Sequence, residues 1–450
     1  MIIYVNKKIV KKINFKNEKS KILDALFLFI LIFGPPFMPY PHLVLSLVSL
    51  ILLLLYIKKD KNGILQILKE SGILEWIIVF SMVFLYTILI PFTLSSFAND
   101  IVNIGNYISI INRFGVLVVT ILTCDILFFY IMRKKRTTWD YFIEVLIYAG
   151  MIEGGCSILA FLFPKVKIFF ISLMSRFSGG DAYSNGWYTT VRCYGFASTL
   201  VDLFGLGIAL IAGIAFFYGV TYKQKYIWYS MMIIIAALLN ARTGVIVYLI
   251  SIIITLVYWG YKGHIKIIIK SLIGIVLVIL GACVAIDILS TNEATFSWVN
   301  SAYESVISIF KTKNISNNDW ANPIANLING QSLELPKGIR FIFGTGHSVY
   351  LAKGYKHSDI GYINEIWLWG ILGCFIVYGF IIKISKRIIC QCRIAVFKFA
   401  GLYLLISFAF FNFKCEVLGY NPGAVTFFLL FFGANIFNEC RIEKLYSKGF

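Results

Sequence analysis

The chain has 450 residues, of which 59% are hydrophobic and 14% are charged, and its formal net charge is +19. A soluble globular protein is nearer half apolar and a quarter charged, so the composition excludes a soluble domain and predicts an integral membrane protein. At about 20 residues for each membrane-spanning helix, the length allows roughly a dozen helices. The positive charge is expected to serve orientation and to attract anionic lipid carriers, and no nucleic-acid partner is expected.

Hydrophobic segments follow one another along the chain, separated by polar or basic turns. They predict twelve helices, at residues 22–38, 42–57, 73–93, 106–132, 141–163, 196–219, 226–239, 243–261, 271–288, 361–382, 395–412 and 420–438. Pro35 and Pro36 end or kink the first helix. No signal-peptide cleavage pattern follows the basic N-terminus, so the first segment is expected to stay as an anchor.

The lysines and arginines are clustered, which predicts the orientation of the chain. The clusters lie before the first helix, at 58–61, 133–136, 220–225, 262–270 and 383–393, and in the C-terminal tail. Cytoplasmic loops carry an excess of Lys and Arg, so we expect an all-α polytopic membrane protein with both termini in the cytoplasm. Residues 1–450 then form one membrane domain, and two larger loops, 164–194 and 289–360, lie on the outer face.

The longer outer loop is expected to contain an amphipathic helix. Apolar side chains recur at helical spacing, with Ser, Asn and Glu between them, at Phe296, Val299, Tyr303, Val306 and Phe310. This pattern is typical of a helix that lies on the membrane surface.

Two arginines stand at short junctions on the predicted outer face. Arg192 precedes the sixth helix, and Arg242 lies in the short turn between the seventh and eighth. An arginine at a helix end often extends to phospholipid headgroups. Glu153, Asp202 and Asp287 lie toward the outer halves of helices and could simply pair with these arginines. The joint pattern of arginines and acids at one face nevertheless favours a site.

The densest polar stretch runs from Arg340 to Gly373 and passes from a loop into a hydrophobic helix. It contains His357, Asp359 and Glu365. A lone histidine or aspartate would more often be a solvated loop residue. An acid–histidine pair at the membrane boundary, together with two arginine junctions, predicts half of an active site on the outer face.

No metal site or cofactor is expected. The nine cysteines are scattered, mostly in apolar helices or basic loops, where a buried cysteine acts as a small hydrophobe. Cys390 and Cys392 form a Cys-x-Cys pair, but no second pair or histidine accompanies it. No Asp-x-Asp pair lies on the predicted outer side.

Four segments resemble the superfamily of O-antigen polymerases and O-antigen ligases. They are RCYGFAS before the sixth helix, NARTG before the eighth, FGTG, and HSDIGYINEIWLWGILG before and within the tenth. The resemblance implies a bacterial inner-membrane protein with about a dozen helices, acting in the periplasm on polyprenyl-pyrophosphate-linked glycans. The family arginines correspond to Arg192 and Arg242, and Arg340 has no secure counterpart.

The register near Gly370 separates the two branches of this superfamily. In the ligase branch, a histidine followed by Asn, Ser or Gln stands eleven residues before the helix glycine. Counting back from Gly370 gives Asp359, and His357 lies two residues earlier. The Asp-x-Gly-Tyr form ending at Tyr362 is more similar to the polymerase branch. Either Asp359 or His357 is therefore left as the candidate base.

The resemblance implies a chemistry that these residue types suit. Guanidinium groups bind phosphate oxygens in pairs, so Arg192 and Arg242 are expected to bind the pyrophosphate leaving group. A carboxylate or imidazole can accept the proton of the attacking sugar hydroxyl. Arg340, Tyr362 and Glu365 are further candidates for substrate binding.

The expected function is therefore a metal-independent polymerase of a bacterial surface polysaccharide, either O-antigen or capsule. Its substrate would be an undecaprenyl-pyrophosphate-linked oligosaccharide, with membrane lipid, a chain-length regulator and a flippase as candidate partners. A ligase, a flippase or transporter, and a scaffold without chemistry are the alternatives. The two halves of the chain do not look alike, unlike those of many transporters.

Overall fold

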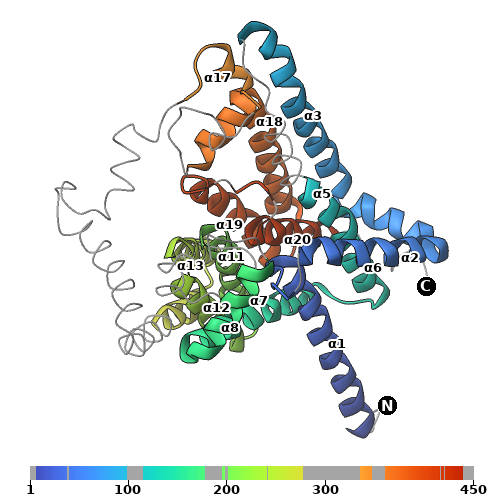
Figure 1. Cartoon of the computed structure of the whole chain (residues 1–450). Coiled ribbons are helices and arrows are strands. Elements are labelled where there is room, and N and C mark those ends of the chain that lie inside the picture. Colours follow the sequence, from blue (N-terminus) through green and yellow to red (C-terminus); the bar gives the residue numbers. More distant parts are fainter. Residues whose placement is uncertain are drawn as a thin grey trace, which may run out of the picture.

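The computed structural model describes residues 7–37, 40–98, 115–177, 195–197, 201–240, 242–276, 335–346, 360–415, 417–419 and 421–438. Side chains are described for all of these except residues 7–18, 91–98, 201–202 and 242. Within this part the regular structure is entirely helical (Figure 1). The predicted all-α fold is confirmed to this extent.

The helices follow the order of the predicted segments. They are α1 (Lys7–Phe33), α2 (Pro41–Ser71), α3 (Ile73–Ala98), α5 (Val116–Thr120), the π-helix η2 (Ile121–Asp125), α6 (Ile126–Lys134), α7 (Trp139–Leu162), α8 (Pro164–Phe177), α11 (Val201–Thr221), α12 (Lys225–Asn240), α13 (Arg242–Tyr261), α17 (Ile339–Phe343), α18 (Gly361–Gln391), α19 (Ala395–Phe411) and α20 (Pro422–Ile436). Residues 265–276 are helical as well. Each of the twelve predicted segments therefore overlaps a helix.

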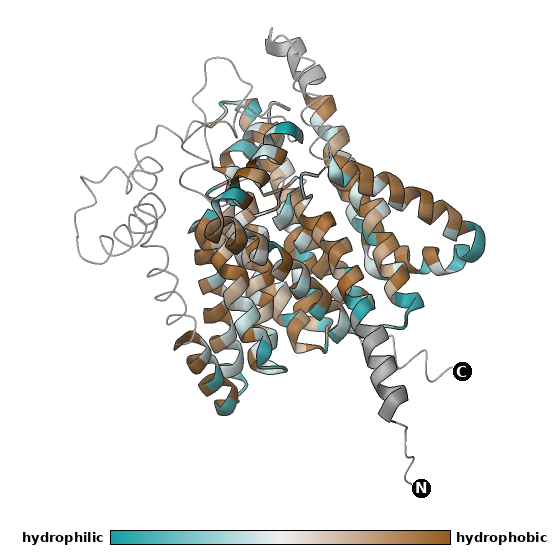
Figure 2. Cartoon of the chain, turned by 60° about the horizontal axis from the view of Figure 1, so that its bottom comes forward, coloured by the Kyte–Doolittle hydropathy of each residue, from teal (hydrophilic) through white to brown (hydrophobic). Residues whose placement is uncertain are grey.

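The described helices suit a multi-pass membrane protein. Seven of them are long and apolar enough to cross a bilayer, and α12, α19 and α20 are shorter apolar helices. Hydrophobic residues cover the lengths of the helices, and hydrophilic residues gather near their ends and turns (Figure 2). The first arm of α2 exposes a row of leucines, among them Leu47, Leu54 and Leu55, as expected for a surface in contact with lipid.

Several segments predicted to be loops are helical instead, among them residues 265–270, 383–391 and the short α17. Two further ones are the second arm of α2 and α8. The helix predicted to end at residue 57 continues as α2, with a break at Asp60 (φ −153°, ψ 64°), and its second arm buries Ile64 and Ile67. The first part of the expected loop 164–194 is α8, which begins at Pro164. Proline is well tolerated at the first position of a helix, and apolar side chains at helical spacing give both segments a face to bury.

Among the described residues, seven ion pairs gather at one end of the helices. They are Lys21–Glu144, Arg133–Glu70, Lys134–Asp60, Lys135–Asp24, Lys223–Asp140, Lys223–Glu144 and Arg387–Glu75. The members come from segments that the clustered basic residues assign to the cytoplasm. The pairing therefore puts those segments on the same side of the bundle, as that orientation requires.

Lys223 shows how this charged layer is stabilised. Its ammonium lies 2.6 Å from Asp140 Oδ2 and 2.6 Å from Glu144 Oε1. Partial burial alone would lower the pKa of Lys223, but the hydrogen bonds to these two carboxylates outweigh it and raise the pKa. Lys21 donates to the other oxygen of Glu144, so this buried carboxylate bridges α1 and the turn after α11.

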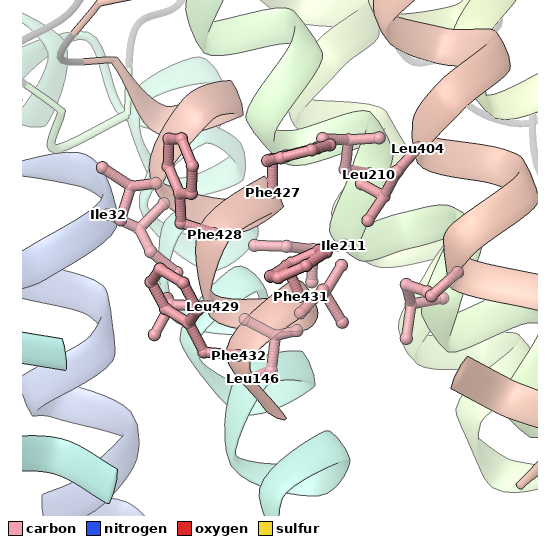
Figure 3. Close-up of a cluster of buried hydrophobic side chains, with 14 of the residues drawn as sticks. Ile32, Leu146, Leu210, Ile211, Leu404, Phe427, Phe428, Leu429, Phe431 and Phe432 are labelled. Carbon is pink, nitrogen blue, oxygen red and sulfur yellow. The ribbon is translucent and has the colours of Figure 1, made fainter. Parts of the chain in front are cut away.

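The core is built around α20 and α11. Phe427, Phe428, Phe431 and Phe432 project from α20 toward neighbouring helices (Figure 3). They pack with Ile32, Leu146, Leu210, Ile211 and Leu404, which come from α1, α7, α11 and α19. In the span Leu203–Thr221 of α11, 94% of the residues in the most apolar stretch are buried. Both helices are thus enclosed by the others, which fixes the positions of their ends.

Candidate active site

Helix α18 is a helical hairpin and not a single rod. Gly370 has φ 64° and ψ −179°, and it divides the helix into arms at 361–369 and 371–391. The Tyr378 hydroxyl donates a hydrogen bond to Glu365 Oε2, and the Tyr362 and Tyr378 rings are 5.7 Å apart. In a continuous helix, residues 365 and 378 would be separated by about 20 Å. The prediction of one unbroken helix through 361–382 is therefore wrong at Gly370.

The turn after α17 locks this break in place. The backbone N–H of Thr345 donates to Trp367 O at 2.7 Å, its hydroxyl donates to the same oxygen at 2.8 Å, and Gly346 N donates to Leu368 O at 3.1 Å. These donors replace the intrahelical bonds that the break removes. A broken backbone at membrane depth requires such partners, because lipid supplies none.

Asn412, just after α19, joins both arms of the hairpin to the loop that leads to α20. Its Nδ2 donates to Glu365 Oε2 at 2.9 Å and to the Tyr378 hydroxyl. Its Oδ1 accepts from Val417 N at 3.2 Å, and its backbone oxygen accepts from Tyr362 N at 3.3 Å. All the polar groups of its side chain are therefore used, and the first turn of α18 is fixed against the end of α19.

The predicted site residues at the start of α18 divide into two groups. His357 and Asp359 lie outside the described residues. Tyr362 is described, and its hydroxyl donates to Ala409 O at 2.7 Å. Glu365 is 0% exposed, and its Oε2 accepts hydrogen bonds from the two side chains just described, Tyr378 among them. This geometry suits a carboxylate that holds the hairpin together, and the substrate contact expected from the sequence stays a prediction.

The next predicted site segment is the stretch between Arg192 and α11. Arg192 itself lies outside the described residues. Phe196 N donates to Glu153 Oε2 at 3.1 Å. Glu153 is completely buried in α7, and a methyl group at Gly195 would overlap its other oxygen and lie 2.6 Å from Ser157 Oγ. The segment that follows Arg192 is therefore held closely against α7 by a buried carboxylate.

Arg242 is the first residue of α13, directly after the end of α12. Ser230 of α12 donates a hydrogen bond of 2.9 Å to the Tyr248 hydroxyl of α13, so the two helices lie side by side in opposite directions. Asn240 closes α12, and its Nδ2 donates to Ala236 O at 3.1 Å. Gly244 allows close packing, because a methyl group there would be 2.6 Å from Gly205 O of α11.

A continuous series of contacts connects these three helix starts. Gly244 meets Gly205 of α11, and Gly207 of the same helix meets Pro422, where a methyl group would be 2.8 Å from the Pro422 carbonyl carbon. Asn421 caps α20 by accepting from Ala424 N at 2.9 Å, and its Nδ2 donates to Val417 O at 2.8 Å. Val417 in turn donates to Asn412, which holds α18. The first turns of α11 and α13 and the start of α18 thus lie around the start of α20, at the end opposite the ion pairs.

Arg340 lies in α17 and is partly exposed, next to the exposed apolar side chains of Ile339, Ile342 and Phe343. Its backbone oxygen accepts from Gly344 N at 2.8 Å. The Tyr86 hydroxyl of α3 donates to Phe343 O at 2.9 Å. These contacts tie α17 to α3 and to the hairpin turn.

Among the described residues, no group of three or more His, Cys, Asp or Glu side chains is arranged to hold a metal ion. Cys390 is exposed and Cys392 is buried. Sequence reasoning did not single out Asn412, Tyr378 or Thr345. The available signals were an asparagine in the apolar run Phe410–Phe413 and the repeated glycines around Thr345.

No protein-family model matches the chain, and no curated protein matches it at a significant level.

Proposed function

We propose that this protein polymerises a bacterial surface polysaccharide, O-antigen or capsule. It would transfer a polyprenyl-pyrophosphate-linked glycan to a sugar hydroxyl of a second lipid-linked repeat unit at the outer face of the cytoplasmic membrane. The observation that carries the proposal is the convergence of three motif ends that lie far apart in the sequence. The starts of α11, α13 and α18 are connected through Pro422, Asn421 and Asn412.

The proposed chemistry needs two kinds of group: cations that bind the pyrophosphate and a base that accepts a proton. Arg192 and Arg242 would bind the pyrophosphate, which already leaves well, and would stabilise the charge that develops on it in the transition state. Asp359, with His357 beside it in the sequence, would accept the proton of the attacking hydroxyl. The sugar–phosphate bond breaks as the new glycosidic bond forms, and the lipid pyrophosphate departs with the bonding electron pair.

Glu365 takes a different role in this proposal from the substrate contact expected at first. Its burial and its bonds to Tyr378 and Asn412 support a role in holding the start of α18. Tyr362 has its hydroxyl bound to Ala409 O, and it stays a candidate for sugar stacking. Arg340, partly exposed beside the hairpin turn, stays a candidate for binding lipid phosphate.

A flippase or transporter is the second candidate, and one observation favours it. Discontinuous helices with satisfied backbone breaks are common at transporter binding sites, and α18 is broken at Gly370. The ligase alternative would instead move a finished glycan to another acceptor. A flippase needs no proton acceptor, whereas a ligase, like a polymerase, must take up the proton of the acceptor hydroxyl.

One strain separates the three functions. The gene is deleted, and the lipid-linked glycans and surface polymer are analysed by gel and by mass spectrometry. Single lipid-linked repeats on the outer face are the expected result for a polymerase. Long chains that are not attached to an acceptor would indicate a ligase, and repeats trapped on the cytoplasmic face would indicate a flippase.

A further inference from the structure

The contact between Asn412 and Glu365 lies very close to the segment that carries the proposed base. Gly361 abuts Asn412 so tightly that a methyl group on Gly361 would overlap its side-chain oxygen and lie 2.6 Å from Cys415 O. Asp359 is two residues before Gly361 in the chain. At about 3.8 Å per residue, its Cα is no further than about 7.6 Å from that of Gly361. The proposed base is therefore close, along the chain, to a residue that Asn412 holds in place.

We infer that Asn412 and Glu365 act as a pair of positioning residues, through which α19 sets the position of the first turn of α18, which follows the proposed base directly in the chain. The inference rests on the proposed function for its catalytic meaning, because the base it positions is the base of the polymerase reaction. It does not require either residue to contact substrate.

The chemistry of the contact explains why a polar pair serves this purpose better than an apolar one. Apolar contacts are non-directional, and α18 could slide along α19 at little cost. Hydrogen bonds are directional, and those of Asn412 reach three separate segments at once. Losing one partner leaves buried polar groups unsatisfied, so each member of the network holds the others in place.

Tyr378 extends the pair to the second arm of the hairpin. Its hydroxyl donates to Glu365 and accepts from Asn412 Nδ2. The first arm is therefore tied both to α19 and to the long arm 371–391, which Arg387 anchors at the other end with two bonds of 2.9 Å to Glu75. The first turn of α18, directly after the proposed base, is thus connected to a rigid helix, as precise catalytic geometry requires.

A reciprocal exchange of side chains tests the inference. Four proteins are compared: the wild type, Asn412→Asp, Glu365→Gln and the double variant. Asn412→Asp sets two carboxyls against each other, and the double variant restores one amide facing one carboxylate. The assays are run at about pH 8.5, because two adjacent carboxyls hold a shared proton at lower pH. The probe is the lipid-linked repeat unit extracted from a strain that lacks this protein.

We expect Asn412→Asp to lower kcat by about tenfold or more with KM nearly unchanged, since misplacement of the base weakens the chemical step. The double variant should recover to within about threefold of the wild type. Asn421→Asp is the matched control: it changes another buried asparagine of the same outer region, which caps α20 and does not contact Glu365. Glu365→Gln should not rescue that variant.

A second readout does not depend on activity. Ile360 is 6% exposed, so the thiol introduced by Ile360→Cys should react slowly with a maleimide. The reaction should be faster with Asn412→Asp and slow again in the double variant, as measured by site-resolved mass spectrometry. If the wild type does not polymerise the extracted lipid, the proposed function fails. The labelling of Ile360→Cys then decides by itself whether Asn412 and Glu365 position the first turn of α18.

The inference is overturned if the double variant shows no recovery in both readouts, or if kcat is the same in all four folded proteins. Should Asn412→Asp fail to fold, Tyr378→Phe replaces it, because it removes one hydroxyl and keeps the ring. Unchanged kcat and unchanged thiol labelling in Tyr378→Phe would then exclude the positioning role.

Discussion

Gly344 and Gly370 approach each other so closely that neither position has room for a side chain. A methyl group on Gly344 would lie 2.6 Å from Gly370 N, and a methyl group on Gly370 would overlap the backbone of Ile342 and Gly344. Both glycines have positive φ, 84° and 64°. The two glycines therefore allow the hairpin of α18 in two ways. Each adopts a backbone conformation that other residues disfavour, and their lack of side chains lets the turn after α17 approach the break closely.

This relationship predicts that Gly370→Ala destabilises the protein. The alanine would be strained at φ 64° and would also collide with backbone atoms that cannot move away freely. We expect the free energy of unfolding to fall by about 1–3 kcal/mol, which is measured as a lower midpoint of thermal unfolding in detergent. Gly344→Ala should behave in the same way.

Gly379→Ala is the matched control for this prediction. Gly379 lies in the same helix, and no atom would be within 4 Å of a methyl group there. Alanine is a better helix former than glycine by about 1 kcal/mol, so this variant should be neutral or more stable. Equal unfolding midpoints for Gly370→Ala and Gly379→Ala would argue against the locked hairpin.

The same glycines show what sequence reasoning could and could not predict. Runs of apolar residues long enough to span a bilayer identify helices reliably, and the twelve predicted segments all overlap helices. The break at Gly370 has no comparable signal, because Gly373 and Gly379 occupy the same apolar run and stay helical. The break depends on backbone donors from Thr345 and Gly346, which lie more than twenty residues away.

The candidate site was predictable in part for a similar reason. Arginines and acids next to apolar helices are conspicuous, so the sequence singles out Arg192, Arg242 and Asp359, whose roles stay predictions. Asn412 could not be singled out in this way, because its importance comes from side-chain hydrogen bonds to three partners on separate segments. The amphipathic helix predicted at 296–310 lies outside the described residues and stays a prediction.

The orientation of the chain predicts which cysteines react from which side. Cys390 follows the ion pair between Arg387 and Glu75 and is exposed, whereas Cys392 is buried. Impermeant maleimide should therefore leave Cys390 unlabelled in intact spheroplasts and label it in inverted vesicles. Cys193 and Cys415 are expected on the outer side, and Cys440 on the inner side.

Cys415 and Cys390 give the clearest comparison, since both lie in described segments at opposite ends of the bundle. Each is measured in a variant that keeps only that cysteine, with total labelling after solubilisation as the reference. Labelling of Cys390 in intact spheroplasts, together with protection of Cys415, would reverse the orientation and move the candidate site to the cytoplasm.

The two arginines of the proposed site predict that activity is sensitive to substitution by lysine. Arg192→Lys and Arg242→Lys keep the charge and lose the planar fork that binds two phosphate oxygens. We expect both to lose most polymer, about tenfold or more, if each guanidinium contacts the transition state. Polymer is scored on gels of a deletion strain that carries each variant, with the membrane level of the protein measured in parallel.

Arg133→Lys provides the control for this series. Arg133 lies at the other end of the bundle, and its Nη1 makes one bond of 3.0 Å with Glu70, which a lysine can approximate. Its polymer should be close to that of the wild type. Wild-type polymer from Arg192→Lys or Arg242→Lys would instead show that the residue concerned only anchors its helix end at the lipid headgroups.

The last prediction distinguishes the two candidate bases before α18. Asp359 stands in the register of the proposed family, eleven residues before Gly370, and imidazole is a common general base in enzymes, so His357 is also a candidate. If the segment is extended, residues two apart share one face, and the carboxylate could orient the imidazole.

We expect Asp359 to be essential and His357 to contribute. Asp359→Asn keeps the shape and removes the charge, so it should abolish polymer, while His357→Ala should weaken it. Both variants are scored by polymer on gels in a complemented deletion strain, with Ser358→Ala as the control, because it changes the residue between them without removing a base. Normal polymer amount and length from Asp359→Asn would exclude it as the base, and loss of polymer in His357→Ala alone would assign that role to the imidazole.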